Sequence, residues 1–136
     1  MRFDDAVKFG FIRYFNFTTR SSRSEYWWWV LFTILVDFIL VFLNSMLFGP
    51  SVEQSNTEAT LIYYDSGVFG AIFGLFIFAP SIAVGCRRLH DINKSGWWQF
   101  IAIVPLIGWA FLLYWFVKTG DDGDNRFGPN PLIYVT

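Results

Sequence analysis

A continuous apolar segment, Tyr26 to Phe48, limits what this chain can fold into more than any other feature of its sequence. As a helix rising about 1.5 Å per residue, this segment is long enough to cross a hydrocarbon core about 30 Å thick. We therefore expect it to be the first membrane-spanning helix. Its strongly polar members are Thr33, Asp37, Asn44 and Ser45.

The composition also favours lipid as the surrounding solvent. Apolar residues make up 54% of the 136 residues, aromatic residues 22% and charged residues only 15%. A single domain of this length has too little interior to bury seven Trp and seventeen Phe. One Cys and one His exclude an intramolecular disulfide and the usual clustered metal site. We expect no metal, no cofactor and no nucleic-acid partner.

Two further apolar segments follow. Residues 67–86 carry no charge, and residues 97–117 have Gln99 as their only clearly polar side chain. Pro105 and Gly108 interrupt the third segment near its middle, and we expect one kinked span. The alternative is a re-entrant hairpin that turns at Pro105 to Gly108, which would need protein cover for its broken backbone.

The predicted fold is therefore a small all-helical membrane bundle within a single domain, residues 1–136. Its three spans are expected at 26–48, 67–86 and 97–117, after an N-terminal amphipathic segment. That segment suits a short helix in the membrane interface, or equally a helix packed on the bundle. Its apolar face consists of Phe3, Ala6, Val7, Gly10 and Tyr14.

Polar side chains in the first span share one narrow stripe. At 100° per residue the stripe is about 40° wide. Because a central Asp costs about 2.5 to 3.5 kcal/mol in a bilayer, the stripe should face other helices. Asp37 then either belongs to a proton, ion or substrate path or fixes helix packing through a hydrogen bond. The stripe comprises Tyr26, Thr33, Asp37 and Asn44.

Small residues in the second span should let a neighbouring helix approach closely, either within the chain or in an oligomer or partner. These residues are Gly70, Gly74 and Ser81.

The Lys and Arg residues predict the orientation. Residues 1–25 hold five of them, residues 49–66 none and residues 87–94 three. The N-terminus and residues 87–94 should therefore be cytoplasmic. Three spans leave the C-terminal tail outside, whereas a hairpin over 97–117 returns it to the cytoplasm.

A cluster of basic residues should gather at that cytoplasmic interface. Arginine offers forked donors that match phosphate oxygens, so the cluster could bind an anionic lipid headgroup or a phosphorylated ligand. Alternatively, its charges serve only to orient the chain during insertion. The candidate binding residues are Arg20, Arg23, Arg87, Arg88, His90, Asp91 and Lys94.

Several strings in the sequence resemble a known family in the same order along the chain. They are FNFTTRSSRSEYWWWVLF, Pro80, RRLHDINKSGWW, the PLIG of 105–108 and GDDGDNRFGPNP. This pattern is similar to the bacterial inner-membrane family called domain of unknown function 805. One departure is Thr19, where the family pattern usually has Gly, so a tight turn there is in doubt. The resemblance implies a small integral inner-membrane protein and brings no activity or catalytic residue.

Three functions remain as hypotheses. The first is a non-enzymatic module that binds anionic lipid or a partner membrane protein through the cytoplasmic Arg cluster. The second is a transporter or ion-conducting oligomer that uses Asp37. The third is an enzyme acting on lipids through His90 and Asp91, which would have to use a lone histidine as general base. The sequence does not favour this third hypothesis, and it identifies no catalytic residue.

Overall fold

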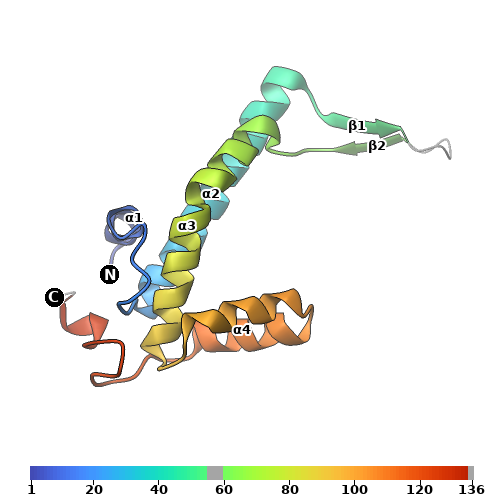
Figure 1. Ribbon diagram of the computed structural model, residues 1–136. Coiled ribbons are helices and arrows are strands. Elements are labelled where there is room, and N and C mark those ends of the chain that lie inside the picture. The colour runs from blue at the N-terminus through green and yellow to red at the C-terminus, as the bar shows by residue number, and fades with distance from the viewer. Residues whose placement is uncertain (55–59, 135–136) are drawn as a thin grey trace. The chain divides into compact units, whose positions relative to one another are not determined.

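Helices form most of the regular structure in this computed structural model, which describes residues 1–54 and 60–134 (Figure 1). Within these residues the structure has four α-helices, two 3-10 helices and two short strands. In chain order the elements are α1 Phe3–Ile12, α2 Arg23–Phe48, β1 Ser51–Gln54, β2 Thr60–Tyr63, α3 Gly67–Asp91, η1 Gly96–Ile103, α4 Ile107–Val117 and η2 Pro131–Tyr134.

Two of these helices are long and apolar enough to cross a membrane. In the most apolar 18-residue stretch of α2 only 6% of residues are buried, and in that of α3 only 17%. The core helix of a water-soluble protein would be mostly buried, so this exposed apolar surface fits a lipid environment. The predicted helical membrane fold is confirmed, and α4 supplies a third, shorter apolar helix.

The chain divides into two compact units. Unit 1 contains Met1–Val30 and Ala79–Thr136, and unit 2 contains Leu31–Phe78. Each of the two long helices therefore has one part in each unit. Each unit is described below by itself.

Unit 2 contains a short β-hairpin that the sequence did not predict. Strand β1 pairs antiparallel with β2, with Ser51 opposite Tyr63. At the base of the hairpin, the Asp65 carboxylate accepts hydrogen bonds from Ser51 Oγ at 2.9 Å and from Asn44 Nδ2 at 3.4 Å. Asn44, which the sequence placed on the polar stripe, thus contacts the connection between the two long helices.

In unit 1, the third apolar segment folds back on itself. The single kinked helix expected over 97–117 does not form, and the hairpin alternative does: η1 and α4 lie side by side (Figure 1). The chain reverses in a γ-turn at Leu106, where φ is +63° and Ile107 N donates to Pro105 O at 2.7 Å. Trp109 Nε1 donates to Ala102 O at 3.0 Å and joins the two arms.

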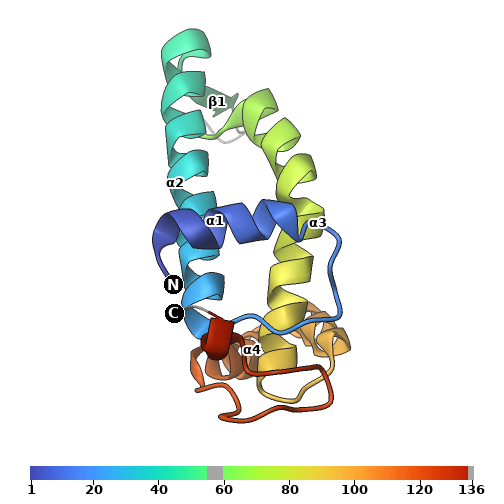
Figure 2. The same cartoon turned by 90° about the vertical axis from the view of Figure 1, so that its left-hand side faces the viewer.

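Helix α1 packs on the beginning of α2 (Figure 2). Ala6 and Gly10 are buried, and a side chain at Gly10 would collide with the Trp29 ring. Phe3 and Trp28 add an edge-to-face contact with ring centroids 5.8 Å apart. The expected N-terminal amphipathic helix therefore forms, and it packs against α2.

The turn after α1 forms despite the departure from the family pattern at Thr19. Asn16 Oδ1 accepts hydrogen bonds from the backbone N of Thr18 at 3.0 Å and of Thr19 at 3.3 Å. A side-chain oxygen that bonds the backbone two and three residues later is an ordinary way of closing such a turn.

The tail after α4 lies at the end of α3. Asp121 N donates to Asp91 O at 2.8 Å, and Asn125 Nδ2 donates to His90 O at 2.9 Å. Residues 118–134 are therefore on the same side of unit 1 as residues 87–94. The hairpin alternative implies this position for the tail, because the η1–α4 pair brings the chain back to where it started.

Replacing Gly108 with Ala should force the two arms of the hairpin apart. A Cβ at Gly108 would collide with the backbone carbonyl oxygen of Ile101, which cannot rotate away. We expect a loss of about 1 to 3 kcal/mol, measured as a lower melting temperature in detergent. Gly74→Ala is the matched control, because a Cβ there has open space around it. Equal melting temperatures for the two variants would contradict the packing of η1 against α4.

Candidate functional site

Five charged side chains form a buried network in unit 1, which we call the arginine clamp. Their exposed fractions run from 0% for Arg87 and Arg88 to 4% for Asp91. Charged side chains are almost never buried this completely unless they are paired. The members of the clamp are Arg20, Glu25, Arg87, Arg88 and Asp91.

Arg87 joins α3 to the start of α2 and to the turn after α1. Its Nη2 donates to Glu25 Oε1 at 3.2 Å, and its Nε donates to Ser21 Oγ at 2.9 Å. Its Nη1 donates to the carbonyl oxygens of Arg13 at 3.0 Å and Asn16 at 2.9 Å. One guanidinium group thus holds three segments together.

The Asp91 carboxylate is shared by two arginines. Arg88 Nη1 donates to Asp91 Oδ2 at 2.8 Å. Arg20 donates to Asp91 Oδ1 through both Nη2, at 2.9 Å, and Nε, at 3.1 Å. Each carboxylate oxygen therefore has its own cation.

The remaining donors of Arg20 bind the tail. Its Nη1 donates to the carbonyl oxygen of Gly123 at 2.6 Å and of Gly128 at 3.2 Å. Its Nη2 donates to the carbonyl oxygen of Asp121 at 2.8 Å. These bonds fix the position of the irregular tail.

Arg88 binds the end of α4 in the same way. Its Nε donates to Phe116 O at 3.2 Å, and its Nη2 donates to Trp115 O at 3.3 Å and to Lys118 O. The last carbonyl groups of a helix lack partners within the helix, so a guanidinium group suits this position.

The local sequence places Glu25 correctly for the clamp. Helix α2 begins at Arg23, and the preceding Ser22 accepts a hydrogen bond on its Oγ from Glu25 N at 3.3 Å. This is the start of a helix with a hydroxyl cap and an acidic residue in the first turn. Glu25 Oε1 accepts a further hydrogen bond from Ser21 Oγ at 2.8 Å.

Because of the clamp, only some of the predicted basic residues are exposed at the surface of the protein. The donors of Arg20, Arg87 and Arg88 point into the protein. Of the predicted cluster, Arg23 is exposed and Lys94 is half-buried, with its Nζ 4.7 Å from the centroid of the Trp115 ring. Whether these residues bind lipid stays a prediction.

Two exposed basic residues at this end were not among the binding residues predicted from the sequence. They belong to the tail, which three spans would have placed on the other side of the membrane. Lys118 follows Val117, whose carbonyl oxygen accepts a hydrogen bond from Arg23 Nη1 at 3.2 Å. Arg126 Nη2 donates to Asn93 O at 3.1 Å, next to Lys94. We call Arg23, Lys94, Lys118 and Arg126 the basic edge.

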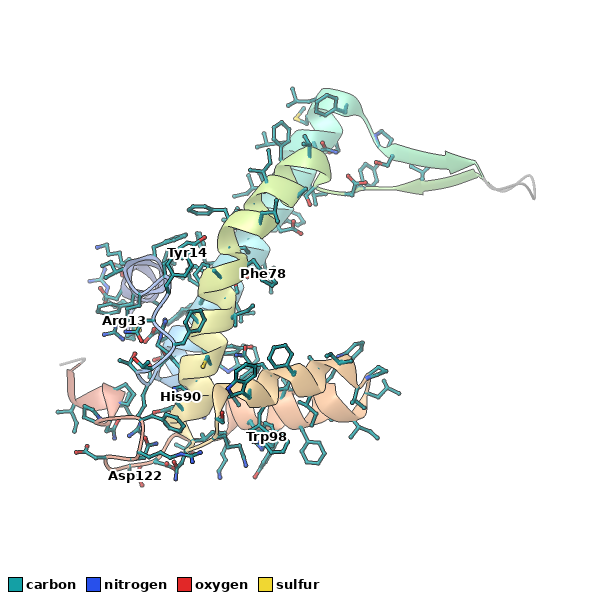
Figure 3. All side chains as sticks on the ribbon, in the orientation of Figure 1. Arg13, Tyr14, Phe78, His90, Trp98 and Asp122 are labelled. Carbon is teal, nitrogen blue, oxygen red and sulfur yellow. The ribbon has the colours of Figure 1, made fainter. Side chains whose placement is uncertain are left out.

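His90 lies beside the clamp, where α3 ends (Figure 3). Its Nδ1 is 3.1 Å from the Thr19 carbonyl oxygen, and its ring stacks on Phe127 with centroids 3.8 Å apart. Its Nε2 is 3.5 Å from Cys86 Sγ. Within residues 1–54 and 60–134 no three His, Cys, Asp or Glu side chains form a group that could hold a metal ion.

A pocket of about 710 Å³ opens next to His90, between α3 and η1, and we call it the α3–η1 pocket. Aromatic and aliphatic side chains form most of its wall, and a few uncharged polar groups lie among them. Its lining includes Ile82, Cys86, His90, Ser95, Gln99 and Phe100.

In unit 2, Asp37 is exposed and lines a groove of about 400 Å³ between α2 and α3. Thr33, Gly70 and Gly74 line the same groove, and a Cβ built at Gly70 would be 3.7 Å from Asp37 Oδ1. The other predicted small residue, Ser81, lies in unit 1 and accepts a hydrogen bond from Trp29 Nε1 at 3.1 Å.

The last member of the predicted stripe, Tyr26, also lies in unit 1. Its ring packs against Phe116 of α4, with ring centroids 4.3 Å apart. Tyr26 therefore contacts the η1–α4 hairpin, whereas Thr33, Asp37 and Asn44 belong to unit 2.

Arg87→Gln should destabilise the protein strongly, because it leaves Glu25 buried without its cation. Breaking a buried ion pair in this way costs about 3 to 5 kcal/mol. Thermal unfolding in detergent should show a much lower melting temperature for Arg87→Gln. The control Arg23→Gln, at an exposed position, should change the melting temperature little. The double variant Arg87→Met/Glu25→Leu should recover part of the loss, since no unpaired charge remains. A drop no larger for Arg87→Gln than for Arg23→Gln would argue against the clamp.

Comparison with known proteins identifies relatives over almost the whole chain. The sequence model of a family described as "Protein of unknown function (DUF805)" matches residues 14–129. Inner membrane protein YhaH of Escherichia coli (strain K12) is 36% identical over 120 residues, which cover 88% of this chain and 90% of that protein. Inner membrane protein YhaI of the same strain is 31% identical over 118 residues, 87% of each chain.

No solved structure matches the chain significantly. The family match includes all five members of the arginine clamp, and the apolar helices agree with the inner-membrane location in the names of both relatives. The chain belongs to the DUF805 family of inner-membrane proteins.

Proposed function

We propose that the protein is a non-enzymatic, multi-pass inner-membrane module whose unit 1 binds anionic lipid at the cytoplasmic leaflet through the basic edge. All ten Lys and Arg residues belong to unit 1 and none to unit 2. Basic residues next to membrane spans are retained on the cytoplasmic side, which supports an orientation with the N-terminus in the cytoplasm.

The observation that carries the proposal is the division of the basic residues into two groups. The buried arginines bind carboxylates and carbonyl oxygens of the protein itself, which leaves them no role at the surface. The basic edge remains outside this network. Near an anionic membrane surface each such charge contributes about 1 kcal/mol of attraction.

The surroundings of the basic edge suit an interfacial position. Lys94 Nζ lies over the rings of Trp98 and Trp115, at 5.9 Å and 4.7 Å from their centroids. Aromatic rings of this kind concentrate at the headgroup level of a membrane. Asp122 and Asp124 are also exposed in the tail and reduce the net positive charge there. Binding should therefore be moderate and sensitive to salt.

The double variant Arg23→Gln/Lys118→Gln should bind phosphatidylglycerol more weakly than the parent. Two lost contacts of about 1 kcal/mol each correspond to roughly a thirtyfold increase in Kd. Titration in mixed micelles followed by native mass spectrometry measures this, with phosphatidylcholine as the reference lipid. The matched control is Arg2→Gln/Lys8→Gln, which removes two exposed charges on or next to α1. If both double variants bind phosphatidylglycerol as the parent does, the basic edge is not the binding site.

The second candidate function, an ion-conducting or transporting oligomer, is favoured by the position of Asp37. An exposed carboxylate near the middle of a 26-residue membrane helix is costly unless it is protonated or covered by another chain. The groove that Asp37 shares with Gly70 and Gly74 gives such a chain room to approach.

Asp37→Asn should abolish proton or cation flux if Asp37 lines a path. Purified protein in liposomes with a pH-sensitive dye inside reports this flux. Ser45→Ala is the control, because Ser45 lies off the polar stripe and its hydroxyl donates to the Phe42 carbonyl oxygen. Flux through Asp37→Asn equal to that of the parent, or no flux through the parent at all, would remove this candidate.

A further inference from the structure

The α3–η1 pocket contains no charged residue. Its walls include Ile82, Trp97 and Phe100, which are 39%, 77% and 61% exposed. Small-molecule sites in proteins are typically about 300 to 1,000 Å³, mostly apolar, with a few polar groups that orient the ligand. The pocket has this character, and its lack of Lys and Arg makes it a poor site for a phosphate group.

Gln99 lines this pocket, and its Oε1 lies against Gly85 of α3, where a built Cβ would collide with it. Its Nε2 donates to two carbonyl oxygens, Ile82 O at 3.2 Å and Gly96 O at 3.4 Å. Because both partners are acceptors, the amide nitrogen must face them, and Oε1 is the atom left over. Within the described part of the chain, no protein group donates a hydrogen bond to this oxygen.

His90 and Ser95 complete the polar part of the pocket. The Thr19 carbonyl oxygen can only accept, so His90 Nδ1 carries a proton, and in the neutral ring Nε2 is an acceptor that faces Cys86 Sγ. Ser95 Oγ accepts from Trp97 N at 3.5 Å and keeps its own hydroxyl proton for donation. The polar groups of the pocket therefore include acceptors, Gln99 Oε1 and His90 Nε2, and a donor, Ser95 Oγ. All of these groups are neutral.

We propose that the α3–η1 pocket binds a neutral amphiphile that carries a hydroxyl group on a long apolar chain. A hydroxyl group can donate to Gln99 Oε1 and accept from Ser95 Oγ, which neither a phosphate nor an ammonium group does at both positions. The apolar chain lies against the aromatic wall. The volume of 710 Å³ far exceeds the roughly 150 Å³ of a cavity that holds benzene, so it accommodates a substantial length of chain.

Photolabelling with a sixteen-carbon alcohol that carries a diazirine next to the hydroxyl group tests this proposal. The protein is held in phosphatidylcholine nanodiscs, and the labelled residues are mapped by mass spectrometry. We expect labelling concentrated on residues 82–86 and 95–100. Ile82→Trp, which fills the pocket, should reduce it at least tenfold. Leu113→Trp, an exposed position on α4 outside the pocket, should leave it unchanged. Labelling spread over all lipid-facing helices, or insensitive to Ile82→Trp, overturns the proposal.

The headgroup is tested with probes rather than with variants, so that folding is not disturbed. The methyl ether and the plain hydrocarbon of the same chain length, with the diazirine at the same carbon, should label the pocket several-fold less than the alcohol. The methyl ether accepts a hydrogen bond but cannot donate one to Gln99 Oε1. Equal labelling by all three probes would show an apolar crevice without selectivity and would refute the assignment.

The test is independent of the proposed anionic-lipid site. Labelling by the alcohol should persist in 1 M salt and in Arg23→Gln/Lys118→Gln. At 1 M salt the Debye length is about 3 Å, so screening weakens the binding of a charged ligand and leaves that of a neutral one unchanged. Excess unlabelled diacylglycerol should compete, and phosphatidylglycerol should not. Competition by phosphatidylglycerol that disappears in high salt would mean that the pocket is part of the anionic site, and the neutral assignment would fail.

Discussion

Unit 1 depends on the burial of three guanidinium groups against two carboxylates. Arg87 with Glu25, and Arg20 and Arg88 with Asp91, make ion pairs of 2.8 to 3.2 Å at almost complete burial. Removing such charges from water is expensive, and the network is tolerable only because the remaining donors reach backbone carbonyl oxygens. The arginine clamp therefore adds little net stability by itself. It forms only when every segment that supplies one of its oxygen atoms is in place.

This requirement explains why irregular segments are ordered here. Arg87 binds the turn after α1 and Arg20 binds the tail, in both cases through backbone carbonyl oxygens. If such a carbonyl group moved away, it would leave a buried N–H donor of the guanidinium group without an acceptor, which is costly. The arginines of the clamp thus hold the connected segments of unit 1 together.

Local patterns predicted the long elements well and the short ones poorly. The apolar segments that form α2 and α3 follow from hydropathy, and the amphipathic N-terminal helix follows from the helical spacing of its apolar residues. The reversal at Leu106 was harder to predict, because Pro105 and Gly108 are compatible with either a kink or a turn. The strands Ser51–Gln54 and Thr60–Tyr63 depend on pairing across a connection, and no pattern within either strand indicates it.

The sequence by itself determined that the chain is a helical membrane protein, because apolar length and the positions of the Lys and Arg residues act through the bilayer without reference to the fold. It also indicated that the Arg, His and Asp residues of 87–91 matter. Only the tertiary structure decided what they do. Whether a guanidinium group faces lipid or the protein depends on carbonyl and carboxylate oxygens that other segments of the chain supply, such as Glu25, which is 62 positions away from Arg87. That long-range geometry is not encoded in any local spacing.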